Sequence, residues 1–299
     1  MAGAELLAPI AGGLILGVLA RIALLQVDYR MYPSYPHGWL IHFAWGVIAA
    51  FVGSVVVPAL VAEEFTAATF LVLVAQQFRD IRRMERASLD LVESMELVPR
   101  GPHYIEGIAR TFEARSYLVI AVSLVTSTII TFTGHILAGV AGGVVTFLLV
   151  FMVKRGQRVG DIAKLKAVDV EFEGTLLKVA NVIVMEVGLK KSREWWLNRG
   201  TGVIIEPKDD DARATLASLG QRQAIAHDTA AIMGVTKDFG LPEFTPLVRR
   251  DIETGRVVMA IVPMEPDRRQ ILAAVERVPV LEAARRAPLQ SEPGLKAAD

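Results

Sequence analysis

Two pairs of residues in this sequence carry side chains suited to acid–base chemistry. His103 and Glu106 are three residues apart, so a helix would place them on one face, and Asp228 directly follows His227. The first pair lacks both the third ligand of a metal site and a nucleophile. In a helix, the consecutive residues His227 and Asp228 would point apart. We therefore expect both pairs to be structural, and a catalytic Glu106 is the sharper alternative.

The composition removes further kinds of chemistry. The chain has no cysteine, which excludes disulfides, iron–sulfur clusters, thiolate catalysis and cysteine-based zinc sites. No glycine-rich phosphate loop, placeable Ser–His–Asp set or metal-binding spacing is found. Basic and acidic residues balance at 32 each, so nothing points to nucleic acid. We predict no catalytic residue, no metal and no cofactor, and lean away from an enzyme.

Apolar and charged residues are segregated along the chain. The mean hydropathy is +0.42 although 21% of the residues are charged. The first 153 residues hold nearly all of the long apolar runs, and the remainder resembles a water-soluble domain. The sequence therefore predicts an α-helical membrane part followed by a small cytoplasmic α+β domain.

Five segments are expected to cross the membrane. The first is a retained span and not a signal peptide, because no basic residue precedes it. The third has only 14 residues, fewer than the ~17 that a span normally needs, so it could be re-entrant. We favour a crossing because the charge distribution is then consistent. The five segments are Leu6–Leu25, Trp39–Ala62, Phe65–Phe78, Tyr117–Thr133 and Ile136–Val153.

Basic residues set the orientation. The loop of residues 79–115 contains seven arginines, and Lys154, Arg155 and Arg158 follow the fifth segment. With five crossings these two regions lie on one side, and the loops on the other side have no Lys or Arg. The positive-inside rule then places the N-terminus outside and the C-terminal domain in the cytoplasm.

Small residues in the spans indicate close helix packing. Gly13 and Gly17 form a GxxxG pair in the first span, and Gly139 and Gly143 form another in the fifth. Such pairs allow a second helix to approach closely. We predict that both pairs are helix contacts, with flexibility or chance as the alternative.

Polar residues in the spans are few. Ser123, Ser127 and Thr131 repeat every four residues, so their hydroxyls share one face that could line a wet pathway or hydrogen-bond within the bundle. Hydrogen bonding is favoured. Arg21 lies near the end of its span, where it can reach the headgroups, and His42 is interpreted as an interfacial histidine. No acidic residue is visible inside a span.

The polar interval 79–115 contains the residues Tyr104-Ile105-Glu106-Gly107-Ile108-Ala109. These six letters resemble the signature of the YIEGIA family of multi-pass membrane proteins of endospore-forming bacteria. The resemblance implies a sporulation context, with the cell membrane or the forespore or spore membrane as the location. It also implies a small companion protein as a partner.

The physical properties of this segment suit docking. If the segment is helical, Glu106 and Arg110 stand four apart in the favourable acid-first order, and Gly107 leaves room for a close neighbour. We therefore predict a short docking helix at the membrane surface. Its residues are His103, Tyr104, Ile105, Glu106, Gly107, Ile108, Ala109 and Arg110.

The polar C-terminal part alternates between strand and helix patterns. Val168, Val170 and Phe172 alternate with acidic residues, which is typical of a strand. The whole pattern predicts a small α+β domain, for which a ferredoxin-like fold is one possibility. Strands are predicted at 168–173, 177–187, 202–206 and 257–262, and helices at 209–219, at 221–233 and from Pro266 onward.

Trp195 and Trp196 follow a basic cluster that begins at Lys190. They could touch the inner leaflet, or they could be packed against another part of the protein. The predicted divisions are helices 1–3 at 1–78, the signature segment at 79–115, helices 4–5 at 116–153, the α+β domain at 154–286 and a disordered tail at 287–299.

Three classes of function fit these features. A non-enzymatic scaffold that acts through oligomerisation or a partner protein is favoured. An oligomeric channel or transporter subunit comes second, with the hydroxyl face of the fourth span toward the pore. A membrane-tethered enzyme comes third. The expected partners are the lipid bilayer and a second copy or a small companion protein.

Overall fold

The structure, a computed structural model, describes residues 2–28, 36–93, 96, 98–153, 157–235 and 244–297. It divides into two compact units. The helical unit comprises Met1–Ala87 and Ile108–Arg155, and the α+β unit comprises Ser88–Gly107 and Gly156–Asp299. The segment 79–115, predicted as one piece, is thus divided between the two units. Lys154 and Arg155, on which the predicted orientation partly rests, lie outside the described residues.

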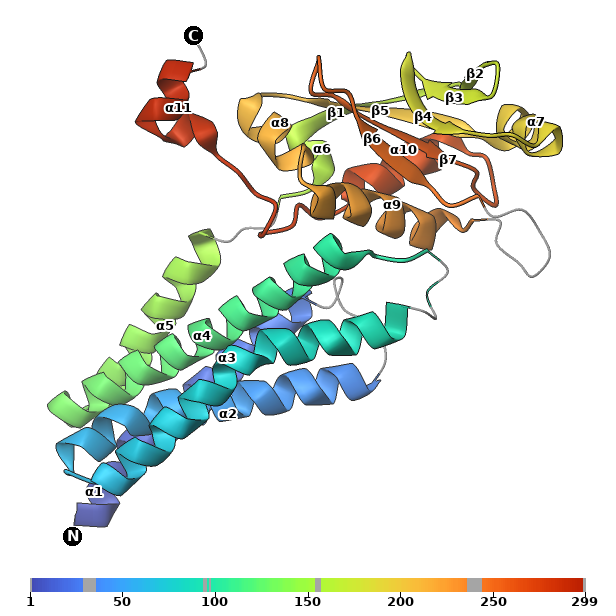
Figure 1. The fold of residues 1–299 in the computed structure, drawn as a ribbon. Coiled ribbons are helices and arrows are strands. Elements are labelled where there is room, and N and C mark those ends of the chain that lie inside the picture. The colour runs from blue at the N-terminus through green and yellow to red at the C-terminus, as the bar shows by residue number, and fades with distance from the viewer. Residues whose placement is uncertain are drawn as a thin grey trace. The chain divides into compact units, whose positions relative to one another are not determined.

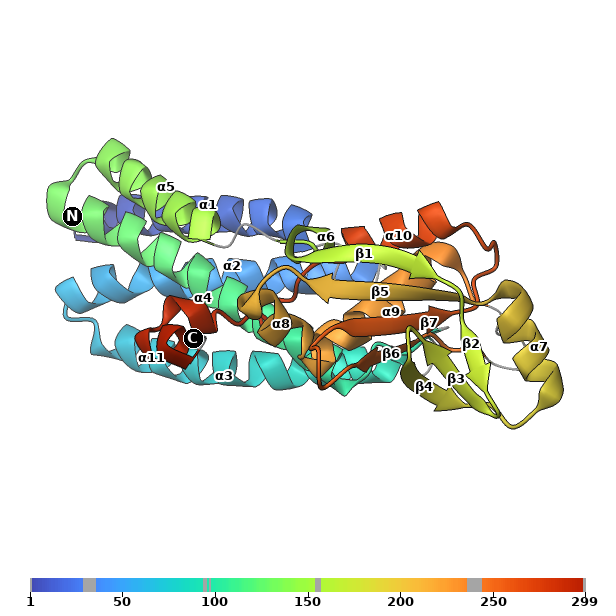
Figure 2. The same cartoon turned by 90° about the horizontal axis from the view of Figure 1, so that it is seen from above.

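Long helices that alternate in direction form the helical unit (Figures 1 and 2). A residue with positive φ, Glu63, joins the second helix to the third, and Gly134, also at positive φ, joins the fourth to the fifth. The first helix packs against the second and the fifth. The helices are α1 (Ala2–Asp28), α2 (Pro36–Val61), α3 (Phe65–Glu93), α4 (Pro102–Thr133) and α5 (Ile136–Val153).

Three of the described helices are long and apolar enough to cross a membrane. They are Leu6–Leu25, Gly38–Val61 and Pro102–Thr133, and a shorter apolar stretch covers Ile136–Leu149. The predicted count of five spans is therefore not supported. Helix α3 is not among these three helices because its apolar first half continues without a break into a strongly charged second half. Large apolar side chains such as Leu19, Phe51 and Leu149 are exposed on this unit, as expected of surfaces that face lipid.

The α+β unit is built on a four-stranded sheet of order β1-β5-β7-β6. All three neighbouring pairs are antiparallel, in agreement with the predicted small α+β domain. A ferredoxin-like sheet is also antiparallel between neighbouring strands, so that possibility stays a prediction. Every residue of β7 is buried. The strands are β1 (Ala163–Val168), β5 (Thr201–Pro207), β6 (Leu247–Arg250) and β7 (Val257–Ile261).

A second, three-stranded antiparallel sheet of order β2-β3-β4 lies in the same unit. Its strands are β2 (Glu171–Glu173), β3 (Leu176–Val179) and β4 (Val182–Glu186). The single strand predicted at 177–187 is therefore a hairpin. Its turn places Ala180 and Asn181 at φ values of 47° and 69°, which is the left-handed region that two-residue hairpin turns use. An alanine at positive φ gives no sequence signal of a turn.

Two helices of the α+β unit begin at aspartate residues that cap them. Asp209 and Asp267 cap α8 and α10 by accepting hydrogen bonds from backbone N–H groups of the first turn. Helices α9 and α10 pack beside each other below the four-stranded sheet (Figure 1). The helices are α6 (Val159–Ile162), α7 (Lys190–Arg199), α8 (Asp210–Leu216), α9 (Leu219–Met233) and α10 (Arg268–Arg277).

The tail differs from its prediction. Where disorder was expected from residue 287, the structure has a 3-10 turn, η2 (Pro288–Gln290), and a short helix, α11 (Glu292–Ala297). The backbone N–H of Leu289 donates to Asp211, and that of Arg286 donates to the Thr215 hydroxyl. These two hydrogen bonds tie the start of the tail to α8, a contact that composition alone does not reveal.

Candidate functional sites

The signature begins where α9 caps the start of α4. Pro102 is the first residue of α4, a position that suits proline because its missing N–H would have no partner there. The next two N–H groups, of His103 and Tyr104, both donate to Oε1 of Gln223, at 3.1 and 3.2 Å. The signature is therefore the first turns of a helix that continues to Thr133, and not the separate short helix that was predicted.

Tyr104 fastens the signature to α9 a second time. Its side chain is 1% exposed, and its hydroxyl donates to Oδ1 of Asp228 over 3.1 Å. The ring also lies edge-on to His227, with 6.0 Å between the centroids. The Nδ1 atom of His227 is 2.6 Å from the carbonyl oxygen of Val98, so we assign the ring proton to Nδ1. The His227–Asp228 pair, which has no catalytic partner in the sequence, thus contacts the signature segment.

Two glycines let helix α9 and the start of α4 lie close together. Gly101 has φ +82°, which favours glycine, and lies against the amide of Gln223. A Cβ at Gly220 would lie 2.8 Å from the carbonyl oxygen of His103. Glycine at both positions allows α9 to approach the signature. Of the remaining signature residues, Ile105, Ile108 and Ala109 are buried, and Glu106 is half-buried.

Burial raises the pKa of Asp228 to about 7, although the Tyr104 hydrogen bond and the Arg100 charge both oppose that rise. The folded protein therefore binds a proton at Asp228 more readily than the unfolded chain, in which the pKa is near 3.8. The stability contributed by this group is present below that lower value and is lost as the pH rises toward about 7.

The Asp228→Asn variant should lose this part of the pH dependence. Its free energy of unfolding should vary less with pH between about 4 and 7, by at most about 1.4 kcal/mol per pH unit. Unfolding of the full chain in detergent micelles, measured across this range, tests the prediction. Asp169→Asn, at an exposed carboxylate, is the control and should follow the wild type. An unchanged slope in Asp228→Asn would show that Asp228 is ionised in the folded protein.

A second polar cluster lies inside the helical unit. Arg21 of α1 is 1% exposed, and its Nε donates to the backbone carbonyl of His42 on α2 over 3.1 Å. Its Nη2 lies 3.5 Å from Nδ1 of the same histidine. On the other side of the ring, Nε2 of His42 lies 3.4 Å from Oε1 of Glu85 on α3. The prediction that Arg21 reaches the headgroups is wrong, because its side chain is buried in the bundle. The side chain of His42 is buried there as well, and its interfacial position stays a prediction.

Phe112 and Gly46 pack directly against this cluster. The Arg21 guanidinium carbon lies 5.0 Å from the centroid of the Phe112 ring, and His42 meets the same ring edge-on at 4.3 Å. A Cβ at Gly46 would lie 2.2 Å from Cγ of Arg21, so the arginine stem occupies the space that any other residue at 46 would fill. Four helices, α1 to α4, contribute to the cluster.

Glu85 is the functional candidate that sequence reasoning missed. It lies in the polar interval 79–115, but Ile81 and Leu89, four residues before and after it, are both buried. Glu85 therefore lies on the apolar face of α3, and a carboxylate on that face is the signal that could have found it. Burial raises its pKa to about 7, although the charge of Arg21 opposes that rise.

Both glycine pairs lie at helix contacts inside the helical unit. A Cβ at Gly13 would lie 2.8 Å from the carbonyl oxygen of Ser123, and a Cβ at Gly17 would lie 1.9 Å from the Ser123 hydroxyl. On α5, a Cβ at Gly139 or Gly143 would meet α4 at 2.3 and 2.0 Å. The pairs thus let α1 and α5 approach α4 of the same chain.

The hydroxyl face of α4 points into the same interior. Ser127 donates to the backbone carbonyl of Ser54 on α2 over 2.6 Å, and Thr131 donates to the carbonyl of Ser127 on its own helix. Ser123 is fully buried. Ser123 and Ser127 thus contact α1 and α2, whereas Thr131 is bonded within its own helix.

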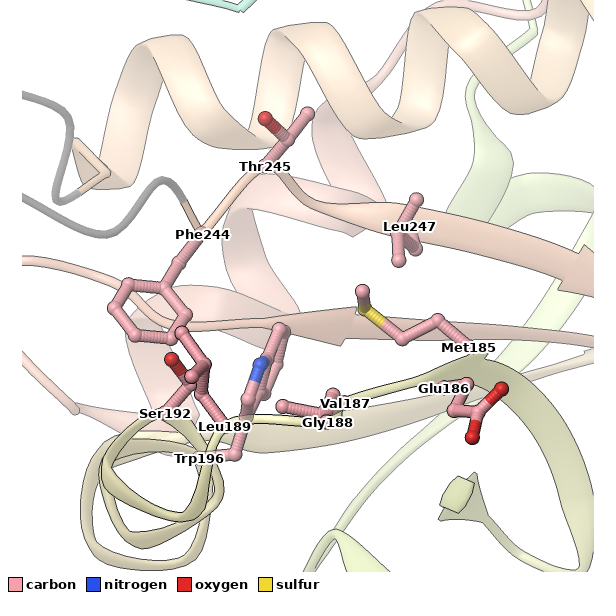
Figure 3. A pocket seen from close by; sticks show the side chains of 10 residues that line it. All are labelled: Met185, Glu186, Val187, Gly188, Leu189, Ser192, Trp196, Phe244, Thr245 and Leu247. Atoms are coloured by element: carbon pink, nitrogen blue, oxygen red, sulfur yellow. The ribbon is translucent and has the colours of Figure 1, made fainter. Parts of the chain in front are cut away.

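The two tryptophans pack in the α+β unit. Trp195 stacks on Phe244 with centroids 5.6 Å apart, and Trp196, which is 2% exposed, meets the same ring edge-on at 5.8 Å. Beside them is an open groove of about 380 Å³ (Figure 3). Its walls are mostly apolar, with Trp196 and Phe244 facing each other, and its polar groups come from Glu186, Ser192 and Thr245.

Apolar helices of membrane length joined to an antiparallel α+β unit are compatible with a membrane protein that carries a folded polar domain. The chain matches the family described as YIEGIA protein over residues 9–291, and it belongs to that family. It is 44% identical over 282 residues to the Bacillus subtilis (strain 168) protein called Uncharacterized protein YphB. That match covers 94% of this chain and 95% of YphB. No solved structure gives a significant match. The predicted family is thus confirmed over nearly the whole chain.

Proposed function

We propose that this protein is a non-enzymatic membrane scaffold that works in sporulation through association with itself or with a small companion protein. The observation that carries the proposal is that the signature is hydrogen-bonded to helix α9. Its first N–H groups and the Tyr104 hydroxyl are engaged by Gln223 and Asp228 of α9, so the residues that name the family build a joint.

The joint suits a scaffold because one helix belongs to both units. Helix α4 contributes Pro102–Gly107 to the α+β unit and Ile108–Thr133 to the helical unit. Holding the first turn of α4 to α9 therefore orders the start of this shared helix within the α+β unit. An ordered surface of this kind can bind a partner with little loss of conformational entropy.

The proposal is tested by purifying the full-length protein in mild detergent from sporulating cells that carry two differently tagged copies. We expect an assembly heavier than the 32.5 kDa chain, containing either both tags or a small protein in fixed ratio to the chain. Mixing separately lysed single-tag cells before purification is the control for association after lysis. A homogeneous monomer with no partner in fixed ratio would contradict the proposal.

A channel or transporter subunit is the second candidate, and one observation favours it. Charged groups buried among membrane helices often mark ion or proton pathways, and Arg21, His42 and Glu85 form such a group. Ion flux through the purified protein in lipid vesicles separates this candidate from the scaffold. A flux that Glu85→Gln abolishes would favour the transporter.

We also propose that the helical unit crosses the membrane five times, with the N-terminus outside and the α+β unit in the cytoplasm. The alternation in direction from α1 to α5 supports this topology, because α3 and α5 return alongside the three apolar helices (Figure 1). Reporter fusions after Asp161 should be active in the cytoplasm, and fusions before Leu6 should be active outside. If both ends report the same side, then one of the two shorter segments does not cross.

A further inference from the structure

Arg21, His42 and Glu85 form a buried polar cluster in which each side chain contacts the next. Three helices each supply one side chain that is less than a tenth exposed, and the contacts between them are 3.1 to 3.5 Å long. Gly46 makes room for the arginine, and the ring of Phe112 covers it. Groups of this kind inside a membrane protein are costly to bury, and they are typically found where a protein handles protons or ions.

The arrangement of donors and acceptors forms a chain. Nη2 of Arg21 can only donate, so the neighbouring Nδ1 of His42 must accept, which places the ring proton on Nε2. That Nε2–H faces the carboxyl group of Glu85. If Nδ1 also bound a proton, the ring would become a cation and place a second positive charge beside the guanidinium. The group that can take up a proton is therefore Glu85, whose carboxylate becomes a neutral carboxylic acid.

We propose that Glu85 is a proton-binding site and that its proton holds α3 against α1 and α2. The ionised carboxylate is more stable in water than in this buried position, although the charge of Arg21, across the histidine ring, favours it. The buried arrangement therefore binds the proton more tightly than an arrangement in which α3 has moved outward. By linkage, proton uptake favours the closed bundle and proton loss favours the open one.

Other charged groups near the site come from two elements. Arg82 and Arg86 flank Glu85 on α3, and they are half-buried and exposed. On α4, Arg115 is buried one turn beyond Phe112. Each is positive, so its charge would favour the ionised carboxylate and oppose the bound proton, as the charge of Arg21 does.

Infrared spectroscopy of the full chain in lipid nanodiscs tests the site. The Asp228→Asn background removes the second carboxyl group, among the described residues, whose pKa is raised by burial. In that background we expect the band of a protonated carboxylic acid to disappear as the pH rises from about 5 to about 8, with the loss of about one proton per chain. Glu85→Gln should remove the band, and Asp80→Asn, at a surface ion pair, should leave it.

The movement of α3 is tested by distances between spin labels. The chain has no cysteine, so Leu40→Cys on α2 and Ala87→Cys on α3, both at exposed positions, can be labelled without background. We expect a longer distance at about pH 8 than at about pH 5 in the wild type, and no pH dependence in Glu85→Gln. If Glu85→Gln does not fold, Arg21→Gln keeps the carboxyl group and should move both transitions to higher pH. A band that persists in Glu85→Gln, or distances that do not depend on pH, would overturn the proposal.

Discussion

Replacing Arg21 with methionine should destabilise the helical unit by about 3–5 kcal/mol, the cost of removing one partner from a buried charged group. Methionine fills similar volume but donates nothing to the carbonyl oxygen or Nδ1 of His42. At about pH 8, where Glu85 is ionised, it also removes the Arg21 charge that favours this buried carboxylate. Reversible denaturation of the full chain in mixed micelles measures the effect. The free energy of unfolding should fall far more than for an ordinary surface change.

Two variants show whether the charge or the volume causes this loss. At about pH 8, where Glu85 is ionised, Arg21→Met combined with Glu85→Met removes both charges, so it should recover much of the stability. Arg83→Met changes an arginine that is 85% exposed and pairs with Asp80 at the surface, and it should have little effect. A small effect of Arg21→Met would mean that Arg21 is not buried in the folded protein.

Replacing Gly17 with leucine should prevent normal packing of α1. Even a Cβ at this position would lie 1.9 Å from the hydroxyl of Ser123 and 2.8 Å from Cβ of Ala50. Overpacking of this kind typically costs about 1–3 kcal/mol, and the three further carbons of leucine should raise the cost. We expect the variant to accumulate poorly and to be extracted as aggregate. Protein level in membranes and the elution profile in mild detergent measure this outcome.

A second substitution at Ser123 tests whether the contact between Gly17 and Ser123 causes this loss. Gly17→Ala should be milder than Gly17→Leu, and Ser123→Ala in the same chain should restore part of its stability by removing the atom that the new Cβ meets. Leu14→Ile, which keeps volume and polarity, should behave as the wild type. Normal accumulation of Gly17→Leu would show that α1 does not contact α4 in this way.

The sequence predicted the broad class of the fold because each signal was local. Hydropathy placed the apolar helices, and alternation or periodicity placed β5, β7, α9 and α10 within a few residues. The hairpin at Ala180 and Asn181 was missed because its turn uses neither glycine nor proline. The length of α3 was missed because the predicted span ended at Phe78, where the charged half of the helix begins.

The polar sites could be predicted only in part, for a physical reason. Arg21, His42 and Glu85 meet from three helices, and periodicity within one helix cannot show which faces will pack together. The signature was identified as a docking helix from its own residues. Its partners, Gln223 and Asp228, are more than a hundred positions away, so nothing local pointed to them.

The central claim is that the signature acts through packing and assembly and not through a reaction. Gln223→Ala removes the acceptor that holds the start of α4, whereas Glu106→Gln removes the carboxylate that an enzyme would need and keeps its shape. The glutamate and Arg110 lie four apart on one face of α4, so exchanging their charges gives a third variant.

The most direct measurement compares two quantities in the same cells, which lack the chromosomal gene and carry one variant each. One quantity is the fraction of the protein in its assembly, and the other is the recovery of the function lost on deletion. We predict that recovery follows assembly in all variants, so Gln223→Ala fails at both and any loss in Glu106→Gln is partly restored by the exchange with Arg110. A Glu106→Gln protein that assembles fully, restores no function and is not rescued at Arg110 would contradict the account and favour a catalytic Glu106.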